Sequence, residues 1–259
     1  SLTYLLLLFT LFACNSTEKK AKVLENKPNI ILIVSDDQGI ADAGFSGSRD
    51  IKTPNIDKIA NEGVIFSQGY VSGSYCSPSR AGILTGRYQQ RFGHELNPPY
   101  EPQNESIGLP FDEVLISDEL KKAGYHTAFL GKVHLGGKVF SKSTGKPKLS
   151  MKGGFQDFDF SRKVEDSPAS LGFDYAYELP QGIQGSPYIA LENGILVGEE
   201  SKLREWKAGQ YGDSVIEADG FGSPSWDSSK FGPILTQKAL SFISKHFSEN
   251  QSNGIRKPF

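Results

Sequence analysis

The stretch "KPNIILIVSDDQG", residues 27–39, decides the fold class of this sequence. Residues 30–34 are an unbroken run of isoleucine, leucine and valine, which predicts a strand buried on both faces. The run stops at Asp36 and Asp37, and open α/β sheets bind ligands at the carboxyl ends of such strands. We therefore expect an α/β domain with a ligand site at this point. Asp42 either orients the loop that follows or caps a helix.

The rest of the sequence alternates helical and strand patterns, as an α/β domain requires. Thr53, Pro54 and Gly63 suit the N-cap, the first position and the stop of one helix. A segment rich in glycine, serine and lysine, residues 136–172, predicts a long surface excursion. In order, we expect helices over residues 54–62, 77–85, 114–123 and 233–247, and strands over residues 64–71 and 125–131.

The bulk composition is that of an ordinary globular protein with one large domain. The 259 residues are 37% hydrophobic and 22% charged, with a formal net charge of −2 at pH 7. Lysines and arginines are scattered and not in excess, which argues against a nucleic-acid partner. The last residues, "RKPF", stand where a further strand is expected to begin, so we expect the N-terminal portion of a longer protein.

The first fourteen residues, "SLTYLLLLFTLFAC", are almost wholly apolar. The run is shorter than a transmembrane helix requires, and it predicts the hydrophobic region of a secretory signal peptide. It ends in "LFAC", which resembles a bacterial lipobox and predicts a lipid on Cys14, with a plain signal peptide cut nearby as the alternative. Residues 15–27 then form a polar tether to a domain over residues 28–259. We expect an exported protein, a periplasmic or outer-membrane lipoprotein of a bacterium.

Cys76, the second of two cysteines, lies in the stretch "SYCSPSRAGILTG". If Cys14 is removed or lipidated, Cys76 cannot form an intramolecular disulfide. It precedes an expected helix N-terminus, where free backbone N–H groups favour anions. A phosphatase-type thiolate loop is excluded because Arg80 follows too closely and Pro78 lacks an N–H. A zinc site is excluded because paired aspartates suit Ca²⁺ or Mg²⁺ better than a thiolate partner. A buried filler, a reactive thiol or a modified residue remains.

The same stretch resembles the signature of the type I sulfatases, members of the alkaline phosphatase superfamily. "CSPSR" followed by "AGILTGR" carries the likeness, which extends over residues 27–259 and is densest before residue 137. It implies an alkaline-phosphatase-like α/β/α sandwich with a large, mostly parallel or mixed central sheet, present here only as its N-terminal portion. Four further motifs match the family in order: "KPNIILIVSDDQG", "TPNIDKIANEGVIFSQGYV", "LKKAGYHTAFLGKVHLG" and "LGFD".

The resemblance implies that Cys76 is the precursor of formylglycine, an aldehyde that hydrates to a geminal diol. A formylglycine-generating enzyme is then a partner in maturation, and Arg80 afterwards anchors the modified side chain. Asp36, Asp37 and the hydrate oxygen of residue 76 would bind Ca²⁺ or Mg²⁺, which lowers the pKa of a bound hydroxyl. That oxygen would attack sulfur and expel the sugar or aryl alcohol, which leaves the sulfate on residue 76, and the second hydroxyl would let the adduct collapse to aldehyde and free sulfate.

Lys132 and His134 match the G-K-x-H-L-G stretch of the family, which gives them their expected roles. Lys132 would bind sulfate oxygens as a fixed positive charge, and His134 would take the hydrate proton during sulfate release. Alternation along a strand end sends both side chains to the same side. Val133 departs from the tryptophan of many relatives, which we expect to change packing and not the roles of its neighbours.

Other basic residues have weaker claims to a role. Arg87, Arg91 and His94, in "GRYQQRFGHELNP", line either a subsite for an anionic sugar or a solvated loop. His126 and His246 are expected in the core or at an interface.

We expect a sulfuric ester hydrolase that removes sulfate from a sulfated carbohydrate, such as a polysaccharide or glycosaminoglycan fragment. A phosphonate or phosphodiester hydrolase of the same superfamily is one alternative. A catalytically silent relative that binds sulfated glycans is another, which the joint presence of all six expected site residues disfavours. The resemblance also implies further cation ligands and a proton donor beyond residue 259, so we expect residues 1–259 alone to be inactive.

Overall fold

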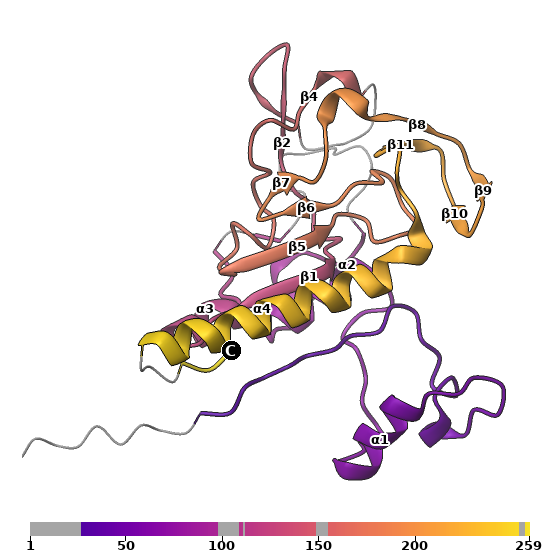
Figure 1. Cartoon of the computed structure of the whole chain (residues 1–259), viewed down its shortest axis with the longest axis vertical. Coiled ribbons are helices and arrows are strands. Elements are labelled where there is room, and N and C mark those ends of the chain that lie inside the picture. The colour runs from indigo at the N-terminus through magenta and orange to yellow at the C-terminus, as the bar shows by residue number, and fades with distance from the viewer. Residues whose placement is uncertain (1–26, 98–108, 111, 149–154, 254–256) are drawn as a thin grey trace, which may run out of the picture.

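The computed structural model describes residues 27–97, 109–110, 112–148, 155–253 and 257–259. A four-stranded sheet forms the middle of its body (Figure 1). The first two strands of this sheet are parallel and the other pairs are antiparallel. In spatial order the strands are β1 (Ala128–Lys132), β5 (Tyr175–Leu179), β6 (Leu191–Glu192) and β7 (Ile195–Leu196).

Helices cover both faces of this sheet. Helix α4 (Phe231–Asn253) runs along one face, and helices α2 (Cys76–Thr85) and α3 (Ile116–Lys122) lie on the other (Figure 1). The mixed sheet between two helical layers agrees with the α/β/α architecture expected from the sequence. The two neighbouring parallel strands, β1 and β5, present their carboxyl ends at one edge, where Lys132 is the last residue of β1.

Side-chain alternation along the parallel strands places one apolar cluster on each face of the sheet. Leu130 packs toward α4 in a cluster that includes the buried Leu179, Trp226 and Phe231. Phe129 packs toward α2 and α3 in a cluster whose buried members are Ala81, Leu84, Leu109, Leu115, Val133 and Leu135. Burial of Val133 and Leu135 therefore anchors the chain on both sides of residue 134.

Smaller sheets extend from this body and contain a third apolar cluster. Val139, Phe158 and Phe160 are buried there with Phe221, which comes from much later in the sequence. The expectation that residues 136–172 form only a surface excursion is wrong, because distant apolar residues give this segment a core. The pairs are β2 (Val139–Ser141) with β3 (Pro147–Lys148) and β4 (Phe158–Asp159), β8 (Arg204–Trp206) with β11 (Gly220–Gly222), and β9 (Gly209–Tyr211) with β10 (Ser214–Ile216).

The four α-helices of the described residues lie close to where the sequence predicts them. Helix α1 (Pro54–Glu62) has the predicted bounds and Thr53 is its N-cap residue, although the Thr53 hydroxyl makes no capping bond to the backbone and donates to Asp57 instead. Helix α2 begins one residue earlier than expected, at Cys76, and ends before Gly86, whose φ of +64° favours glycine. The described 3₁₀ helices are η1 (Gly44–Ser46), η2 (Gln89–Phe92), η3 (Phe155–Asp157), η4 (Glu200–Lys202) and η5 (Ser228–Lys230).

Two predicted strands are absent from the described part of the chain. Residues 30–34 belong to no strand, and Ile33 is 79% exposed. Residues 64–71 likewise form no strand, and Phe66 is 82% exposed. A strand needs a neighbouring backbone to complete its hydrogen bonds, and no described strand supplies one here. The N–H of Ile30 does donate to the carbonyl of Phe259 at 2.8 Å.

Glu178, in β5, is a carboxyl with no exposed surface. Burial raises the pKa of Glu178 to about 7, although hydrogen bonds from the Ala169 N–H and the Ser167 hydroxyl oppose this shift. A carboxyl with a raised pKa stabilises the folded state below its unfolded pKa of 4.5 and loses that contribution as pH rises through 7. We therefore expect Glu178 to contribute a loss of about 3 kcal/mol to the free energy of unfolding over this pH range, opposite in sign to the contribution of His134, whose pKa is lowered.

Glu178→Gln should remove the contribution of Glu178 and leave that of His134, because glutamine has the same shape and does not titrate. The measurement is urea unfolding across the same pH range. Glu205→Gln, on the exposed part of β8, is the matched control and should keep the wild-type slope. An unchanged slope in Glu178→Gln would show that Glu178 is not the titrating group.

Candidate active site

Asp36, Asp37 and Cys76 come together from two segments of the chain. One ligand atom of each, a carboxylate oxygen or Sγ, lies within 4.8 Å of the others. Asp37 has a φ of +54°, a conformation that aspartate tolerates better than most residues. Cys76 is the first residue of α2, so its sulfur lies at a helix N-terminus. The structure thus gathers the three residues that were expected to hold a cation.

Lys132 extends from the end of β1 into this cluster. Its Nζ lies 3.0 Å from Asp36 Oδ2 and 3.4 Å from Cys76 Sγ, and its side chain is only 11% exposed. Arg80, one turn into α2, donates from Nη2 to Asp36 Oδ1 at 2.9 Å and from Nη1 to the Lys132 carbonyl at 2.8 Å. Two positively charged side chains, those of Arg80 and Lys132, therefore flank the Asp36 carboxylate beside Cys76.

The charges of this cluster are fixed by their neighbours. Burial alone would raise the pKa of Asp36, but the hydrogen bond from Lys132 and the charges of Lys132 and Arg80 hold it below its usual value. Asp36 is therefore a carboxylate near neutral pH. The surrounding positive charge suits an anionic group bound next to Cys76.

His134 reaches the same region through a turn. Its φ is +49° and β1 ends at Lys132, so the strand alternation expected for residues 132 and 134 does not explain its position. Burial lowers the pKa of His134 to about 4, and the charges of Lys132 and Arg80 act in the same direction. The imidazole is therefore neutral near pH 7. Its Nδ1 is buried and has no hydrogen-bond partner among the described residues.

Ser77 joins the start of α2 to the loop that follows the helix. Its Oγ lies 2.6 Å from Nε2 of His94, and both residues are buried. Its N–H donates to Oδ1 of Asn97 at 3.0 Å. His94, considered for a sugar subsite, therefore lies behind Cys76 as a buried neighbour of the helix.

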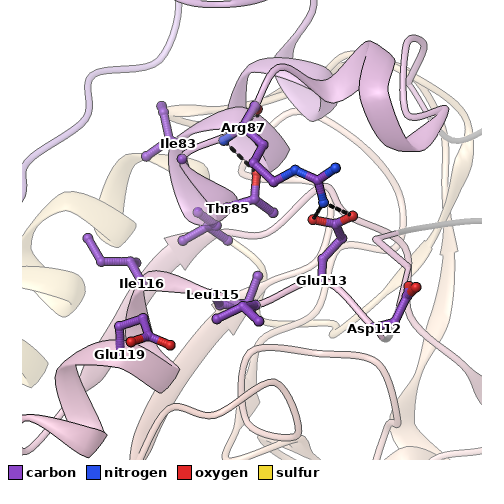
Figure 2. A pocket seen from close by; sticks show the side chains of 11 residues that line it. Ile83, Thr85, Arg87, Asp112, Glu113, Leu115, Ile116 and Glu119 are labelled. Carbon is purple, nitrogen blue, oxygen red and sulfur yellow. Dashed lines mark hydrogen bonds and ion pairs between the residues drawn. The ribbon is translucent and has the colours of Figure 1, made fainter.

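Arg87 lies at the opposite end of α2 from Cys76. Its Nη1 is 2.6 Å from both carboxylate oxygens of Glu113 (Figure 2). This ion pair lies at a pocket of about 420 Å³ that is lined by Ile83, Leu115, Ile116, Asp112 and Glu119, among others. Arg87 is thus engaged away from the cluster. No described hydrogen bond or ion pair links Arg91, in η2, to the cluster either.

Asp42 and two histidines support other parts of the fold. Oδ2 of Asp42 accepts a hydrogen bond from the Gly39 N–H at 2.6 Å, which orients the loop after Asp37. The Nδ1 atoms of His126 and His246 lie 3.0 Å apart, and their rings stack. Both histidines therefore belong to the packing between α4 and the sheet.

Comparison with known proteins identifies the family. The sulfatase family profile matches residues 28–196. This chain belongs to the sulfatase family. Over 92% of its length it is 31% identical to an N-acetylgalactosamine-6-O-sulfatase of Bacteroides thetaiotaomicron, of which it covers 49%. Over 46% of its length it is 43% identical to human steryl-sulfatase, of which it covers 21%.

Solved structures agree with this assignment. A sulfatase structure from work on glycosaminoglycan metabolism by Bacteroides thetaiotaomicron matches with a TM-score of 0.66 and 28% identity, over 85% of this chain and 48% of that one. Ps i-CgsB matches with a TM-score of 0.59 and 28% identity, over 90% of this chain and 43% of that one. The sulfatase chain therefore spans about half, or less, of the length of these relatives.

The gathered donors could hold a divalent cation. Two ligands on one Ca²⁺ at 2.3–2.6 Å lie at most about 5 Å apart, and the atoms of Asp36, Asp37 and Cys76 are within that limit. Carboxylate oxygens suit Ca²⁺ and Mg²⁺, whereas a thiol suits softer metals. The site of this sulfatase chain therefore fits such a cation best when residue 76 offers an oxygen.

Three neighbours of the site were not predicted from the sequence. Ser77 and Asn97 contact each other at the start of α2, and Gly182 packs against Lys132. The sequence shows the motif that contains Ser77, but it does not show that Asn97 and His94 are the partners of Ser77. Nothing in the local pattern around Gly182 marks it as more than a turn residue.

Proposed function

We propose that the full-length protein hydrolyses sulfate esters of sulfated carbohydrates. The observation that carries this proposal is the position of Lys132 Nζ, 3.4 Å from Cys76 Sγ and 3.0 Å from Asp36. A fixed cation beside the reacting residue suits a reaction whose substrate and product are both anions. Membership of the sulfatase family supports the same reaction.

Each basic residue of the site would make a separate contribution. Lys132 would bind sulfate oxygens and orient the ester against residue 76. Arg80, which bonds both Asp36 and the Lys132 carbonyl, would keep these two groups in place. His134, neutral near pH 7, would accept the proton that residue 76 gives up as sulfate leaves.

Asp36, Asp37 and an oxygen of residue 76 would hold the divalent cation, Ca²⁺ or Mg²⁺. When bound, it supplies positive charge that lowers the pKa of a hydroxyl and polarises sulfate oxygens. The resemblance of "CSPSR" to the family signature supports the conversion of Cys76 to formylglycine. A formylglycine-generating enzyme would be the partner that makes this change.

The names of the relatives support sulfated glycans as the substrate class. The bacterial relative is named for N-acetylgalactosamine 6-O-sulfate, and Ps i-CgsB was solved with k-i-k-neocarrahexaose. Both names refer to a carbohydrate. The substrate would be a sulfated polysaccharide or glycosaminoglycan fragment.

Release of inorganic sulfate tests the proposal. The full-length protein, produced together with a formylglycine-generating enzyme, is incubated with sulfated oligosaccharides and with a matched pair of aryl sulfate and aryl phosphate. We expect sulfate release from an oligosaccharide and slower release of phosphate. Faster phosphate release would contradict the proposal in favour of a phosphoester hydrolase. Binding of the glycans without release would indicate a silent relative.

Asp37→Asn should weaken cation binding without disturbing the backbone, because asparagine also tolerates the φ of +54°. We expect Ca²⁺ to raise the melting temperature of the wild type and not of the variant. Sulfate release should fall at least about a hundredfold, since loss of a mere hydrogen-bond partner of a metal ligand already lowers metal affinity or activity 10- to 100-fold.

The control for this variant is Asp42→Asn, which changes a nearby aspartate outside the cluster. It should keep the response to Ca²⁺. An equal rise in melting temperature for Asp37→Asn and the wild type would rule out Asp37 as a ligand.

We also propose that the protein is exported and carries a lipid on Cys14. The apolar run and lipobox-like ending of residues 1–14 support this proposal. Those residues, including Cys14, lie outside the described part of the structure. No helix among the described residues combines the length and the apolar character that a membrane span requires.

A further inference from the structure

Gly182 lies directly against the side chain of Lys132, in the loop that follows β5. Gly182 is buried and has a φ of +80°. A Cβ atom at this position would lie 2.9 Å from Cδ and 3.2 Å from Cγ of Lys132. The first of these distances is shorter than non-bonded carbon atoms accept. Glycine therefore allows the loop to pass over the lysine stem.

Backbone hydrogen bonds bring this loop to the lysine. The N–H groups of Val133 and His134 donate to the carbonyls of Leu179 and Pro180 at 3.0 and 2.8 Å. These bonds join the chains that follow the parallel strands β1 and β5. The N–H of Gly182 then donates to the Leu179 carbonyl at 3.1 Å, and this turn places the loop over the lysine.

Lys132 is thus restrained along its whole length. Arg80 bonds its carbonyl, Gly182 covers its stem, and Asp36 bonds its Nζ. A free lysine has a flexible four-carbon chain. A cation stabilises a developing charge best when it does not have to reorganise during the reaction.

We propose that Gly182 is a positioning residue that keeps Lys132 Nζ beside residue 76. Its effect on the position of Lys132 follows from the packing alone. Its effect on turnover rests on the proposed function, because it requires Lys132 to act on the sulfate.

The test compares Gly182→Ala with Gly124→Ala in the full-length protein. Both changes add a Cβ at positive φ, since Gly124 has a φ of +90°, but nothing lies within 4 Å of the added atom at Gly124. Both variants therefore place a Cβ at a similar positive φ, and only the variant at 182 displaces the lysine.

The first measurement uses protein with unmodified Cys76. The rates of alkylation by anionic iodoacetate and neutral iodoacetamide are followed by mass spectrometry of the Cys76 peptide. A cation 3.4 Å from the sulfur favours the anionic reagent. We expect the ratio of the two rates to fall about threefold in Gly182→Ala, as the charge moves away, and to stay unchanged in Gly124→Ala.

The second measurement is sulfate release by the matured protein. Gly182→Ala should lower kcat by about ten- to a hundredfold, the effect of a shift of about 1 Å in a positioned group. In a Lys132→Ala background the same change should have almost no further effect, because the two residues act as one unit.

The outcomes separate the two proposals. A normal alkylation ratio in a folded Gly182→Ala protein, or additive losses in the double variant, would overturn the positioning role. The ratio of alkylation rates could fall in Gly182→Ala while the wild-type protein releases no sulfate. That result would support the positioning role and refute the proposed function. If Gly182→Ala does not fold, adding Lys132→Ala should restore folding by removing the stem. Failure of that rescue would also count against the contact.

Discussion

Replacing Cys76 with alanine should abolish sulfate release by the full-length protein. Residue 76 is expected to supply both the attacking oxygen and a cation ligand, and alanine supplies neither. Loss of a nucleophile that acts with its partners as one unit costs about three orders of magnitude or more in kcat. The measurement is sulfate release from a sulfated oligosaccharide.

Two further variants make this prediction specific. Cys14→Ala changes the other cysteine of the chain and should leave kcat unchanged in detergent extracts. Cys76→Ser should take up about one sulfate per protein and then stall, because serine lacks the second hydroxyl that a hydrated aldehyde offers for release. Steady turnover by Cys76→Ala would remove residue 76 from the reaction.

Lys132→Met should lower kcat by about 10²- to 10³-fold, the usual effect of removing one preorganised charge from a transition state. Methionine keeps much of the apolar stem that packs under Gly182, so the fold should persist. Asp36 keeps its bond from Arg80 in this variant. The measurement is the separate determination of kcat and KM for sulfate release.

Lys121→Met is the matched control for this change. Lys121 also forms an ion pair with an aspartate, at 2.8 Å from Asp174, but lies on α3 outside the cluster. It should leave both constants unchanged. A rise in KM at constant kcat for Lys132→Met would mean that Lys132 only binds the substrate, contrary to the proposed role.

The features that could be predicted from the sequence are those with local signals. Pro54 at the first position of α1 and Gly86 after α2 mark helix ends that the structure reproduces. The strand predicted over residues 125–131 appears in part, as β1 over residues 128–132, because a parallel partner, β5, lies beside it there. For the site, the resemblance of the motifs to the family predicts Asp36, Cys76 and Lys132 in one site, where the structure also has them.

The features that could not be predicted depend on distant parts of the chain. Residues 30–34 have a strand pattern, but a pattern does not supply the neighbouring strand that completes a ladder. Phe158 and Phe160 lie in a segment with loop composition and are buried because Phe221 packs against them. Gly182 follows an ordinary turn pattern, and its contact with Lys132 becomes visible only when β1 and β5 pair.

The mass of the peptide that contains residue 76, taken from protein that is actively releasing sulfate, tests the central claim most directly. The account predicts that an aldehyde group has replaced the CH₂–SH side chain of Cys76. An intact cysteine at this position in a preparation with full turnover would contradict it.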